Sequence, residues 1–432
     1  MRYFSTNKNS PSVGFKNATI SGQAPDKGLY FPEQIPQIDK SLISDIENLS
    51  NEEIAFIVIK PYVGNEISDE KLFEIVKDTI NFSIPLAQIT ENIFSLELFH
   101  GPTLAFKDVG ARFMSRCLGY FIKDQNKKVT VLVATSGDTG GAVANGFYEV
   151  DGVEVVILYP SGKVSPVQEK QLTTLGKNIH ALEIKGTFDD CQQMVKQAFA
   201  DKDVNEKLFL TSANSINVAR WLPQQFYYFF VYKQWPDKKN PPVISVPSGN
   251  FGNIAAGLLA MRSGLPIHHF IAACNANDVF PKYLQTGNYQ SRKAVATLSN
   301  AMDVGDPSNF IRILEIFNHD FSELKKSLSA YSISDEETLD TIKQAYHQYK
   351  YLLDPHGAVG YSSLQRYLKD HPREKGVFLE TAHPSKFPEA VEKIIDKKID
   401  IPKSVQSFMN KEKQRLLMNT DYNNLKEFLL IK

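Results

Sequence analysis

Lys107 combines a reactive side chain with apolar neighbours. Residues 104–106 before it are Leu-Ala-Phe, and from Val109 to Phe121 an apolar residue recurs at every fourth position. This spacing predicts a helix that starts at or just after Lys107, where the positive end of the helix dipole and partial burial both disfavour an ammonium group. A neutral, sheltered amine can form a Schiff base with a carbonyl compound or with pyridoxal phosphate. The alternative is a surface lysine whose stem passes over apolar neighbours.

A glycine-rich loop at residues 248–253 follows an apolar run and precedes a helical stretch. Glycine lets the backbone approach an anion closely and adopt positive φ, and the N–H groups at a helix start attract phosphate. No lysine follows as in a P-loop, which argues against a nucleoside triphosphate. The loop predicts a phosphate site, with a ligand-free tight turn as the alternative. Its residues are Ser248, Gly249, Asn250, Phe251, Gly252 and Asn253.

A second glycine-rich loop, Ser-Gly-Asp-Thr-Gly-Gly at residues 136–141, also stands between a strand-like run and a helical stretch. It lacks the glycine spacing of a dinucleotide-binding fingerprint. A close turn that presents Ser136, Asp138 and Thr139 could instead wrap a small ligand. An N-cap at Asp138 or Thr139 explains the same residues equally well.

Polar residues at three more places could reach the same ligand. Asn214, Ser215 and Arg220 follow a short apolar run and could converge on a second anion, with the arginine as a charged clamp. Their alternative is a capped helix start with an exposed arginine. Thr381 ends another run and could bind a ligand's ring nitrogen, or it could be a cap or turn residue. His100 lies seven residues from Lys107 and could line the same site.

The elements that must position these residues alternate along the chain. Short apolar runs at residues 129–134, 153–158, 179–184, 208–211 and 243–246 are typical of strands, and helical stretches are expected at 142–148, 167–175, 189–199, 218–235 and 254–262. Alternating strands and helices predict an α/β fold with parallel sheets covered on both faces. Ligands in such folds bind beyond the carboxyl ends of the strands, where these loops fall.

The two ends of the chain lack the alternating pattern of strands and helices that the middle shows. Residues 1–90 are mixed and rich in loops, with a strand-like run at 54–59, and the last thirty residues look helical and amphipathic. We therefore expect an N-terminal domain over 1–90, a catalytic α/β region of two interleaved subdomains over 91–390, and a helical tail over 391–432.

Composition excludes several classes of function. The chain has 432 residues, 42% of them hydrophobic, and a net charge of −1, so nothing favours binding to nucleic acid or an anionic membrane. No apolar run approaches the length of a membrane span, no signal core follows the N-terminus and no metal-binding motif is present. Cys117, Cys191 and Cys274 show no paired spacing, which fits the reducing cytoplasm.

Taken together, the motifs resemble those of the threonine synthases, pyridoxal-phosphate enzymes of the tryptophan-synthase-β-like class. Residues 96–108 are similar to that family's Schiff-base segment, 135–140 to its second cofactor loop, 247–253 to its phosphate loop and 381–384 to the segment under the pyridine nitrogen. Residues 1–90 look like the extra domain of the longer bacterial and fungal branch. The resemblance implies fold type II, with two open, parallel-type sheets wrapped by helices and an extra N-terminal α+β region.

The resemblance also implies a role for each candidate residue. Lys107 would hold pyridoxal phosphate and serve as the catalytic base. The remaining cofactor-binding residues would be Ser136, Asp138, Ser248, Gly249, Asn250, Phe251, Gly252, Asn253 and Thr381, and the substrate-binding residues Thr139, Asn214, Ser215 and Arg220. The substrate would be O-phospho-L-homoserine and the products threonine and phosphate, made by a cytoplasmic monomer or homodimer.

Two alternatives are compatible with the same motifs. One is another enzyme of this class, such as a serine/threonine dehydratase or a cysteine synthase, whose substrates lack a γ-phosphate. The other is a non-enzymatic module that binds a phosphorylated ligand. Asp138 is a departure from many relatives in the wider class, which have asparagine there, because a carboxylate would repel the cofactor's phenolate unless it is protonated or turned away. Its contact with the ring is left open.

Overall fold

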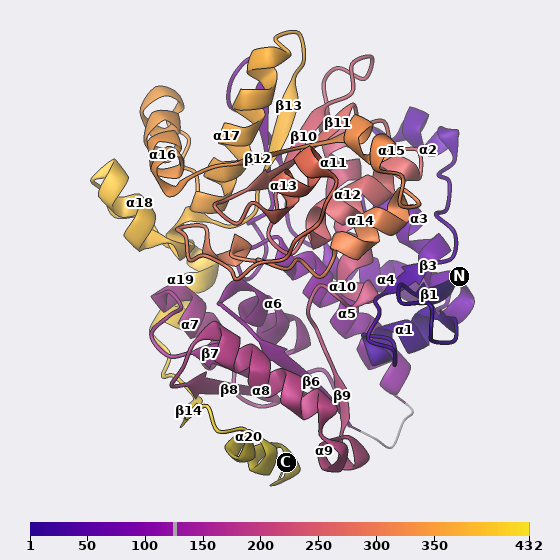
Figure 1. The fold of residues 1–432 in the computed structure, drawn as a ribbon, viewed down its shortest axis with the longest axis vertical. Helices are drawn as coiled ribbons and strands as arrows, with labels where there is room; N and C mark the ends of the chain where they lie inside the picture. The colour runs from indigo at the N-terminus through magenta and orange to yellow at the C-terminus, as the bar shows by residue number, and fades with distance from the viewer. Residues whose placement is uncertain (124–127, 432) are drawn as a thin grey trace.

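The computed structural model describes residues 1–123 and 128–431. A six-stranded and a five-stranded sheet form two helix-covered bodies, the first above the second in Figure 1, and the N-terminal elements lie beside them. A third sheet, of three strands, belongs to the N-terminal region. This arrangement confirms the predicted α/β class with two mainly parallel sheets and an added N-terminal region.

The N-terminal region joins a small antiparallel sheet, of strand order β2-β1-β3, to several helices. Helix α1 contacts α5 (Lys107–Ile122) and helix α3 contacts α11 (Phe226–Gln234), so this region packs on helices from later in the chain. Its elements are β1 (Arg2–Ser5), β2 (Val13–Gly14), α1 (Phe15–Ser21), β3 (Tyr30–Pro32), α2 (Lys40–Asp45), α3 (Asn51–Val63), η1 (Gly64–Glu66) and α4 (Asp69–Thr79).

The prediction of a strand at residues 54–59 is wrong, because these residues lie inside α3. The Ser50 side chain accepts from the Glu53 backbone and the Glu53 side chain from the Ser50 backbone, which forms a capping box. Val58 and Ile59 are buried, and α3 packs against α4. Capping and one-sided burial outweigh the strand preference of the β-branched residues, because that preference depends on context.

The six-stranded sheet has the order β12-β11-β10-β13-β5-β4, and all its pairings are parallel except that of β4 with β5. Its strands are β4 (Leu86–Gln88), β5 (Ile93–Glu97), β10 (Val243–Pro247), β11 (His269–Cys274), β12 (Leu328–Ser332) and β13 (Gly376–Glu380). Its helical segments are α12 (Gly252–Arg262), α13 (Val279–Thr286), η3 (Asn300–Met302), α14 (Phe310–Ile316), α15 (Phe321–Ser327), α16 (Asp335–Tyr349), α17 (Pro355–Asp370), η4 (Pro384–Lys386) and α18 (Pro388–Ile395).

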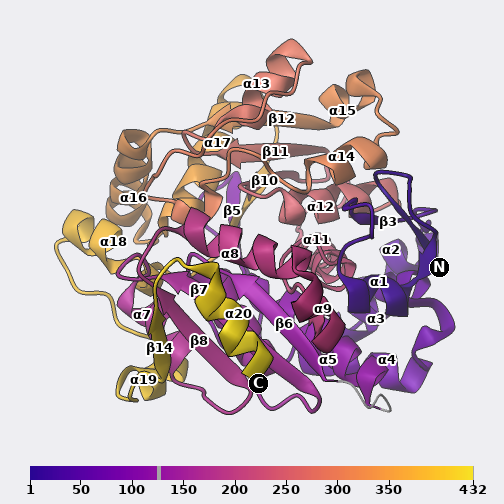
Figure 2. The same cartoon turned by 60° about the horizontal axis from the view of Figure 1, so that its bottom comes forward.

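The five-stranded sheet is parallel throughout, in the order β14-β8-β7-β6-β9. Figure 2 shows α8 and α20 crossing one face of it. Its strands are β6 (Val129–Ala134), β7 (Val153–Pro160), β8 (Ile179–Ile184), β9 (Phe209–Thr211) and β14 (Arg415–Met418). The helices nearest to it in sequence are α5 (Lys107–Ile122), α6 (Asp138–Phe147), α7 (Pro166–Thr173), α8 (Phe188–Ala200), α9 (Lys202–Lys207), α19 (Lys403–Met409) and α20 (Tyr422–Ile431).

Residues 391–432 were predicted as a helical tail, but this segment also contains a strand. Between α19 and α20, strand β14 pairs in parallel with the edge strand β8, with Leu416 opposite Leu182. Helix α20 then packs on α8. The tertiary pairing outweighs the helical pattern of the sequence, since a local propensity is a weak constraint beside a free sheet edge.

The aromatic stretch predicted as one helix over 218–235 is built from three segments: α10 (Val218–Trp221), η2 (Leu222–Gln225) and α11 (Phe226–Gln234). Pro223 lies in the middle segment, where it lacks the N–H that a continuous helix needs. Residues 226–231 are fully buried, and α11 contacts both α3 and α12. Across the described residues, no helix is both long and apolar enough to span a membrane.

Candidate active site

Lys107 is the first residue of α5, as the sequence predicts. The loop before it turns sharply at Leu104, which has a φ of 58°. Asp108 in the first helical turn accepts a hydrogen bond from the Thr103 backbone N–H at 2.9 Å and another from the Thr103 hydroxyl. The predicted apolar face, at every fourth residue from Val109 to Phe121, is buried. These contacts fix the backbone from which the Lys107 side chain projects.

The Lys107 side chain is only 16% exposed, so it does not lie along the surface. Its Nζ lies 3.7 Å from Asp138 Oδ2. Burial lowers the pKa of the Lys107 amine; Asp138 opposes this shift, and the cations Lys386 and Arg220 reinforce it. A lowered pKa increases the fraction of neutral amine, which is the form that reacts with a carbonyl carbon.

Asp138 opens helix α6 and contacts side chains from several segments. Its Oδ1 lies 2.7 Å from Lys386 Nζ and accepts a hydrogen bond from Gln168 Nε2 at 2.9 Å. Burial alone would raise the pKa of Asp138, but the Lys386 and Lys107 cations hold it well below its usual value. Asp138 is therefore an ionised carboxylate, with one oxygen engaged away from Lys107 and the other facing it.

The helix caps that the sequence left as alternatives fall on other residues. Gly137 precedes α6 and makes no side-chain cap. Asn217 caps α10 by accepting from the Ala219 N–H, and His383 caps η4 by accepting from the Ser385 N–H. Five candidate side chains therefore form no helix cap, namely those of Asp138, Thr139, Asn214, Ser215 and Thr381.

The loop at residues 248–253 connects β10 to α12 and supplies unused backbone donors. Phe251, not a glycine, adopts the left-handed conformation, with a φ of 61°. Gly249 is needed for a different reason, because a Cβ there would lie 2.6 Å from Met302 Cα. Within the described residues, the N–H groups of 249–252 donate to no protein acceptor. Free N–H groups at the start of an eleven-residue helix suit a phosphate.

Two loops meet at the hydroxyl of Ser215. Asn250 Nδ2 donates to Ser215 Oγ at 2.8 Å, and Asn309 Nδ2 donates to the same oxygen at 3.1 Å. Asn309 also donates to the Asn250 carbonyl at 3.0 Å. Arg312, fully buried, donates to the Ser215 carbonyl at 2.9 Å. The structure thus joins a residue predicted for the substrate phosphate to one predicted for the cofactor phosphate.

Arg220 lies in α10 and is buried, not exposed as its alternative required. Its Nη1 donates to the Ala213 carbonyl, whereas Nε is buried with no hydrogen-bond partner among the described residues. No carboxylate of the described chain forms an ion pair with it. Burial lowers the pKa of Arg220 to about 10, and Tyr227 and Asp108 oppose that shift. A buried guanidinium with an unused donor is suited to an anionic ligand.

Thr381 lies directly after β13, and its backbone is bound to the Lys107 segment. The Phe106 N–H donates to the Thr381 carbonyl at 2.9 Å, and the next residues form a bridge, Ala105 with Ala382. The remaining candidates lie at the ends of the other strands. Within the described chain, the half-buried side chains of Ser136, Thr139 and Asn214 make no hydrogen bond, whereas Ser248 Oγ donates to the Val246 carbonyl and Asn253 Oδ1 accepts from the Tyr228 hydroxyl.

Three residues at the site were missed from the sequence: Lys386, Asn309 and Arg312. Lys386 stands beside a phenylalanine in an otherwise apolar and small-residue segment, the same signal that identifies Lys107. Arg312 interrupts an apolar helical stretch, which also signals a buried charge. Asn309 carries no comparable local signal, since its role follows from contacts with residues far away in the chain.

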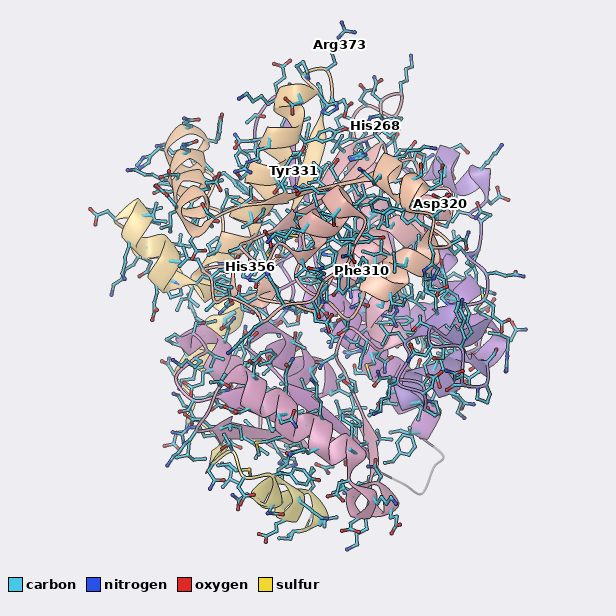
Figure 3. All side chains as sticks on the ribbon, viewed as in Figure 1. His268, Phe310, Asp320, Tyr331, His356 and Arg373 are labelled. Atoms are coloured by element: carbon cyan, nitrogen blue, oxygen red, sulfur yellow. The ribbon has the colours of Figure 1, made fainter. Side chains whose placement is uncertain are left out.

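A buried acidic cluster lies behind Thr381. Glu380 Oε1 accepts from the Asp354 N–H at 2.7 Å, and Asp354 Oδ1 lies 2.5 Å from His356 Nδ1. Figure 3 shows His356 on the part of the upper body that lies toward the five-stranded sheet. His100 is bonded to Glu97 at 2.7 Å, at the end of the neighbouring strand. Among the described residues, the cluster makes no hydrogen bond or ion pair with Lys107, and it lies at the ends of the neighbouring strands.

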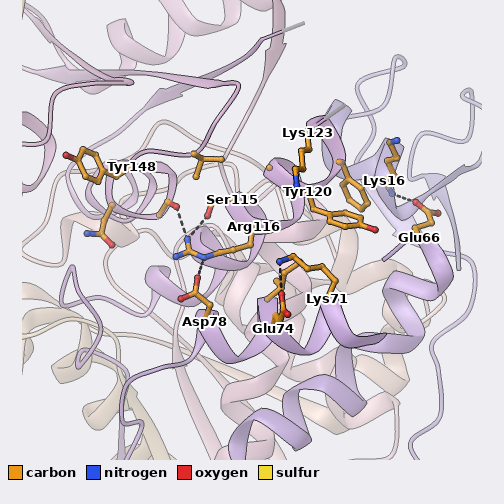
Figure 4. Close-up of a pocket in the computed structure, with 16 residues that line it drawn as sticks. Lys16, Glu66, Lys71, Glu74, Asp78, Ser115, Arg116, Tyr120, Lys123 and Tyr148 are labelled. Atoms are coloured by element: carbon orange, nitrogen blue, oxygen red, sulfur yellow. Dashed lines mark hydrogen bonds and ion pairs between the residues drawn. The ribbon is translucent and has the colours of Figure 1, made fainter. Parts of the chain in front are cut away.

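A separate cavity has a volume of about 1240 Å³. Figure 4 shows the side chains that line it. Ser115, Arg116 and Gly146 line it, from the halves of α5 and α6 remote from Lys107 and Asp138. Its charges are largely satisfied, since Arg116 contacts Asp78 at 2.5 Å. None of the predicted site residues lines this cavity, so it is distinct from the candidate active site.

The fold and the site define the class of protein. Two mainly parallel sheets carry a lysine of lowered pKa at one helix start and unused N–H donors at another, and a family model described as pyridoxal-phosphate dependent enzyme matches residues 83–381. Models described as threonine synthase N terminus and threonine synthase, C-terminal match residues 2–80 and 357–429. The chain belongs to the threonine synthases, a family of pyridoxal-phosphate-dependent lyases.

Individual relatives agree over nearly the whole length. A threonine synthase of Haemophilus influenzae is 45% identical over 419 residues, which is 97% of each chain. A crystal structure of threonine synthase from Escherichia coli matches with a TM-score of 0.92 at 42% identity over 100% of both chains. A pyridoxal-phosphate-bound threonine synthase from Brucella melitensis matches with a TM-score of 0.92 at 35% identity over 99% of this chain and 98% of that one. The dehydratase, cysteine synthase and binding-module alternatives are not favoured.

Proposed function

We propose that this chain converts O-phospho-L-homoserine and water into L-threonine and phosphate at the site around Lys107. The observation that carries the substrate assignment is Arg220. It is a buried guanidinium, near enough to Lys107 to lower the pKa of its amine, and it has an unused Nε donor within the described chain. A second anion site beside the cofactor site is what a substrate with its own phosphate requires, and serine has no group to fill it.

The residues present fit pyridoxal phosphate. We propose that Lys107 holds it covalently, that the N–H groups of residues 249–252 bind its phosphate and that the Thr381 hydroxyl meets its pyridine nitrogen. The unused N–H donors support the second role, and the lowered pKa of the Lys107 amine supports the first. Ser136 and Asp138 complete the cofactor side of the site. An uncharged hydroxyl at the ring nitrogen leaves that nitrogen unprotonated, which limits charge delocalisation and disfavours transamination.

The chain's own groups would orient the substrate and move protons. When bound, pyridoxal phosphate supplies an electron sink for a carbanion next to the substrate nitrogen. Lys107 Nζ would remove the proton at Cα and then transfer protons at Cβ. Arg220, with Thr139, Asn214 and Ser215, would hold the phosphate on Cγ, which fixes the direction of the bond that breaks. Burial of the amine excludes water from Lys107 and favours its neutral form.

We further propose that the chain works as a monomer or homodimer in the cytoplasm. Support for a reducing compartment comes from the cysteines. Cys117, Cys191 and Cys274 are all free and buried, and burial raises the pKa of the Cys117 thiol, which keeps it protonated and unreactive.

Product analysis tests the proposed reaction directly. The full chain, loaded with pyridoxal phosphate, is incubated with O-phospho-L-homoserine, and inorganic phosphate and L-threonine are measured over time. We expect the two products in equal amounts. L-Serine and O-acetyl-L-serine, offered separately, serve as the substrates that a dehydratase or a cysteine synthase would use. A 2-oxo acid in place of threonine, or turnover of serine alone, would contradict the proposal.

A further inference from the structure

Lys386 is a second buried lysine at the site, and none of the sequence motifs predicts a role for it. It ends η4, six residues after the last residue of β13, and its side chain is 0% exposed. Its Nζ lies 2.7 Å from Asp138 Oδ1 and donates to the Thr103 carbonyl at 2.8 Å. A fully buried ammonium is retained only where partners compensate its charge, and these two oxygens are its partners.

The contacts of Lys386 connect segments that belong to different sheets. Asp138 and Gln168 come from helices that follow strands of the five-stranded sheet, whereas Lys386 follows β13 of the six-stranded sheet. Gln171 strengthens the junction, because its Nε2 donates to the same Thr103 carbonyl at 3.0 Å. The junction lies immediately before Lys107, and it fixes both the carboxylate and the loop that face the reactive amine.

The direction in which Asp138 points matters for Lys107. Oδ1 is bound by Lys386 and Gln168, so only Oδ2 is left toward Lys107, at 3.7 Å. A buried carboxylate without a second cation would hold a proton on the neighbouring amine, because an ion pair in a low dielectric is strong. The other charged groups that act on Lys107 are Arg220 and Lys386 themselves, and both favour its neutral form.

We propose that Lys386 is a positioning residue that binds Asp138 Oδ1 to the Thr103 segment and neutralises the carboxylate's charge, so that Lys107 is free to react as a neutral amine. The inference rests on the proposed role of Lys107 as the residue that holds the cofactor. It assigns to Lys386 no contact with the substrate.

The test measures how fast added pyridoxal phosphate attaches to the cofactor-free protein. Attachment joins the Lys107 nitrogen to the aldehyde carbon and releases the aldehyde oxygen as water, so its rate follows the fraction of neutral amine. Borohydride stops the reaction at set times between pH 6 and pH 9, and mass spectrometry quantifies the fixed cofactor on the Lys107 peptide. Chemical denaturation of the same cofactor-free proteins measures stability separately.

Lys386→Met keeps the length of the side chain and removes its charge. We expect attachment at pH 7 to slow by about tenfold or more, and the pH profile to move to higher pH by about one unit or more, because Asp138 then holds a proton on Lys107. Lys386→Arg retains the charge and should retain the wild-type pH profile. Lys413→Met, which removes a lysine paired with Glu169 at the surface, is the matched control and should attach the cofactor as the wild type does.

The double variant Asp138→Asn/Lys386→Met separates positioning from folding. Because it removes the carboxylate as well, we expect its pH profile of cofactor attachment to return to that of the wild type. This profile can be measured even if Lys386→Met alone fails to fold. An unshifted profile in Lys386→Met, with or without lost stability, would overturn the proposal, and so would a double variant that stays shifted or does not fold. If the wild-type protein itself attaches no cofactor at Lys107, it is the proposed function that fails.

Discussion

The chemistry proposed for Lys107 depends on where the helix starts and on which charges surround the amine. The residue begins α5, its side chain is largely buried, and Asp138 is the carboxylate nearest to its amine among the contacts in the structure. Arg220 and Lys386 both lower the pKa of the amine. The site therefore contains more positive charge than its own carboxylate compensates, which suits a cofactor and a substrate that each carry a phosphate.

Arg220→Met tests the second anion site at the scale of a single residue. The substitution keeps an unbranched apolar stem and removes the guanidinium, so we expect the KM for O-phospho-L-homoserine to rise by about ten- to a hundredfold, the value of a charged hydrogen bond. Cofactor attachment at Lys107 should persist. Arg116→Met, which removes an arginine bound to Asp78 away from the site, is the control. An unchanged KM in Arg220→Met would remove this residue from the phosphate site.

The residues that the sequence identified and those that it missed differ in one respect. Lys107, Asp138 and the loop at 248–253 stand in short motifs whose neighbours carry the signal. Lys386 has a local signal like that of Lys107, but its partner, like that of Asn309, lies more than fifty positions away in the chain, at Asp138 for Lys386 and at Asn250 for Asn309. A local pattern cannot show such pairs, because only the folded sheets bring the segments together.

At the scale of the elements, the turn before α6 sets the position of Asp138. Gly137 has a φ of 134°, a conformation that L side chains rarely adopt, and a Cβ there would lie 2.4 Å from Gln168 Cδ. Gln168 is also a hydrogen-bond donor to Asp138. A side chain at 137 would therefore strain the backbone and displace a group that orients the carboxylate.

Gly137→Ala should lower the free energy of unfolding by about 1–3 kcal/mol through backbone strain, and by more if Gln168 cannot move. Gly162→Ala is the matched control, since Gly162 also has a positive φ, of 67°, but a Cβ there would meet nothing within 4 Å. We expect a smaller loss in the control, of about 1 kcal/mol. Urea denaturation of the two variants beside the wild type measures both values, and equal losses would show that the contact with Gln168 is unimportant.

Prediction of the elements succeeded where the pattern was local and failed where packing decided. The strands and helices predicted between residues 129 and 262 occur in the predicted order, except that α9 was not predicted and the helix predicted at 218–235 is three segments. Residues 54–59 were predicted as a strand because of their β-branched side chains, although a capping box and burial make them part of α3. Residues 415–418 form a strand only because the edge of β8 is available to them.

At the scale of the whole molecule, we expect one buried carboxylic acid to make the free energy of unfolding depend on pH. Glu380 ends β13, and its Oε2 is buried with no partner among the described residues. Burial, and then the Asp354 charge, raises the pKa of Glu380 well above its usual value. The folded chain therefore keeps a proton that the unfolded chain releases above about pH 4.3, so stability falls as pH rises beyond that point.

Glu380→Gln removes this linkage while it keeps the shape of the side chain. We expect the slope of the free energy of unfolding against pH, between pH 5 and pH 8, to become less negative than in the wild type by up to about 1.4 kcal/mol per pH unit, the value for one proton. Urea denaturation at several pH values measures the slope. Glu323→Gln, at the surface, is the control, and a slope in Glu380→Gln equal to that of the wild type would show that Glu380 is ionised in the fold.

The proposed chemistry as a whole requires one covalent bond between the chain and its cofactor. In the proposed site, the Lys107 amine, the donors of 249–252 and the Thr381 hydroxyl would all bind one cofactor, and Lys107 would form the covalent bond to it. The most direct measurement is peptide mass spectrometry of the borohydride-reduced, cofactor-loaded protein, with Lys107→Ala beside it. We predict a reduced pyridoxal phosphate adduct on the Lys107 peptide alone, absent from Lys107→Ala. An adduct on another lysine, or one that persists in Lys107→Ala, would contradict the account.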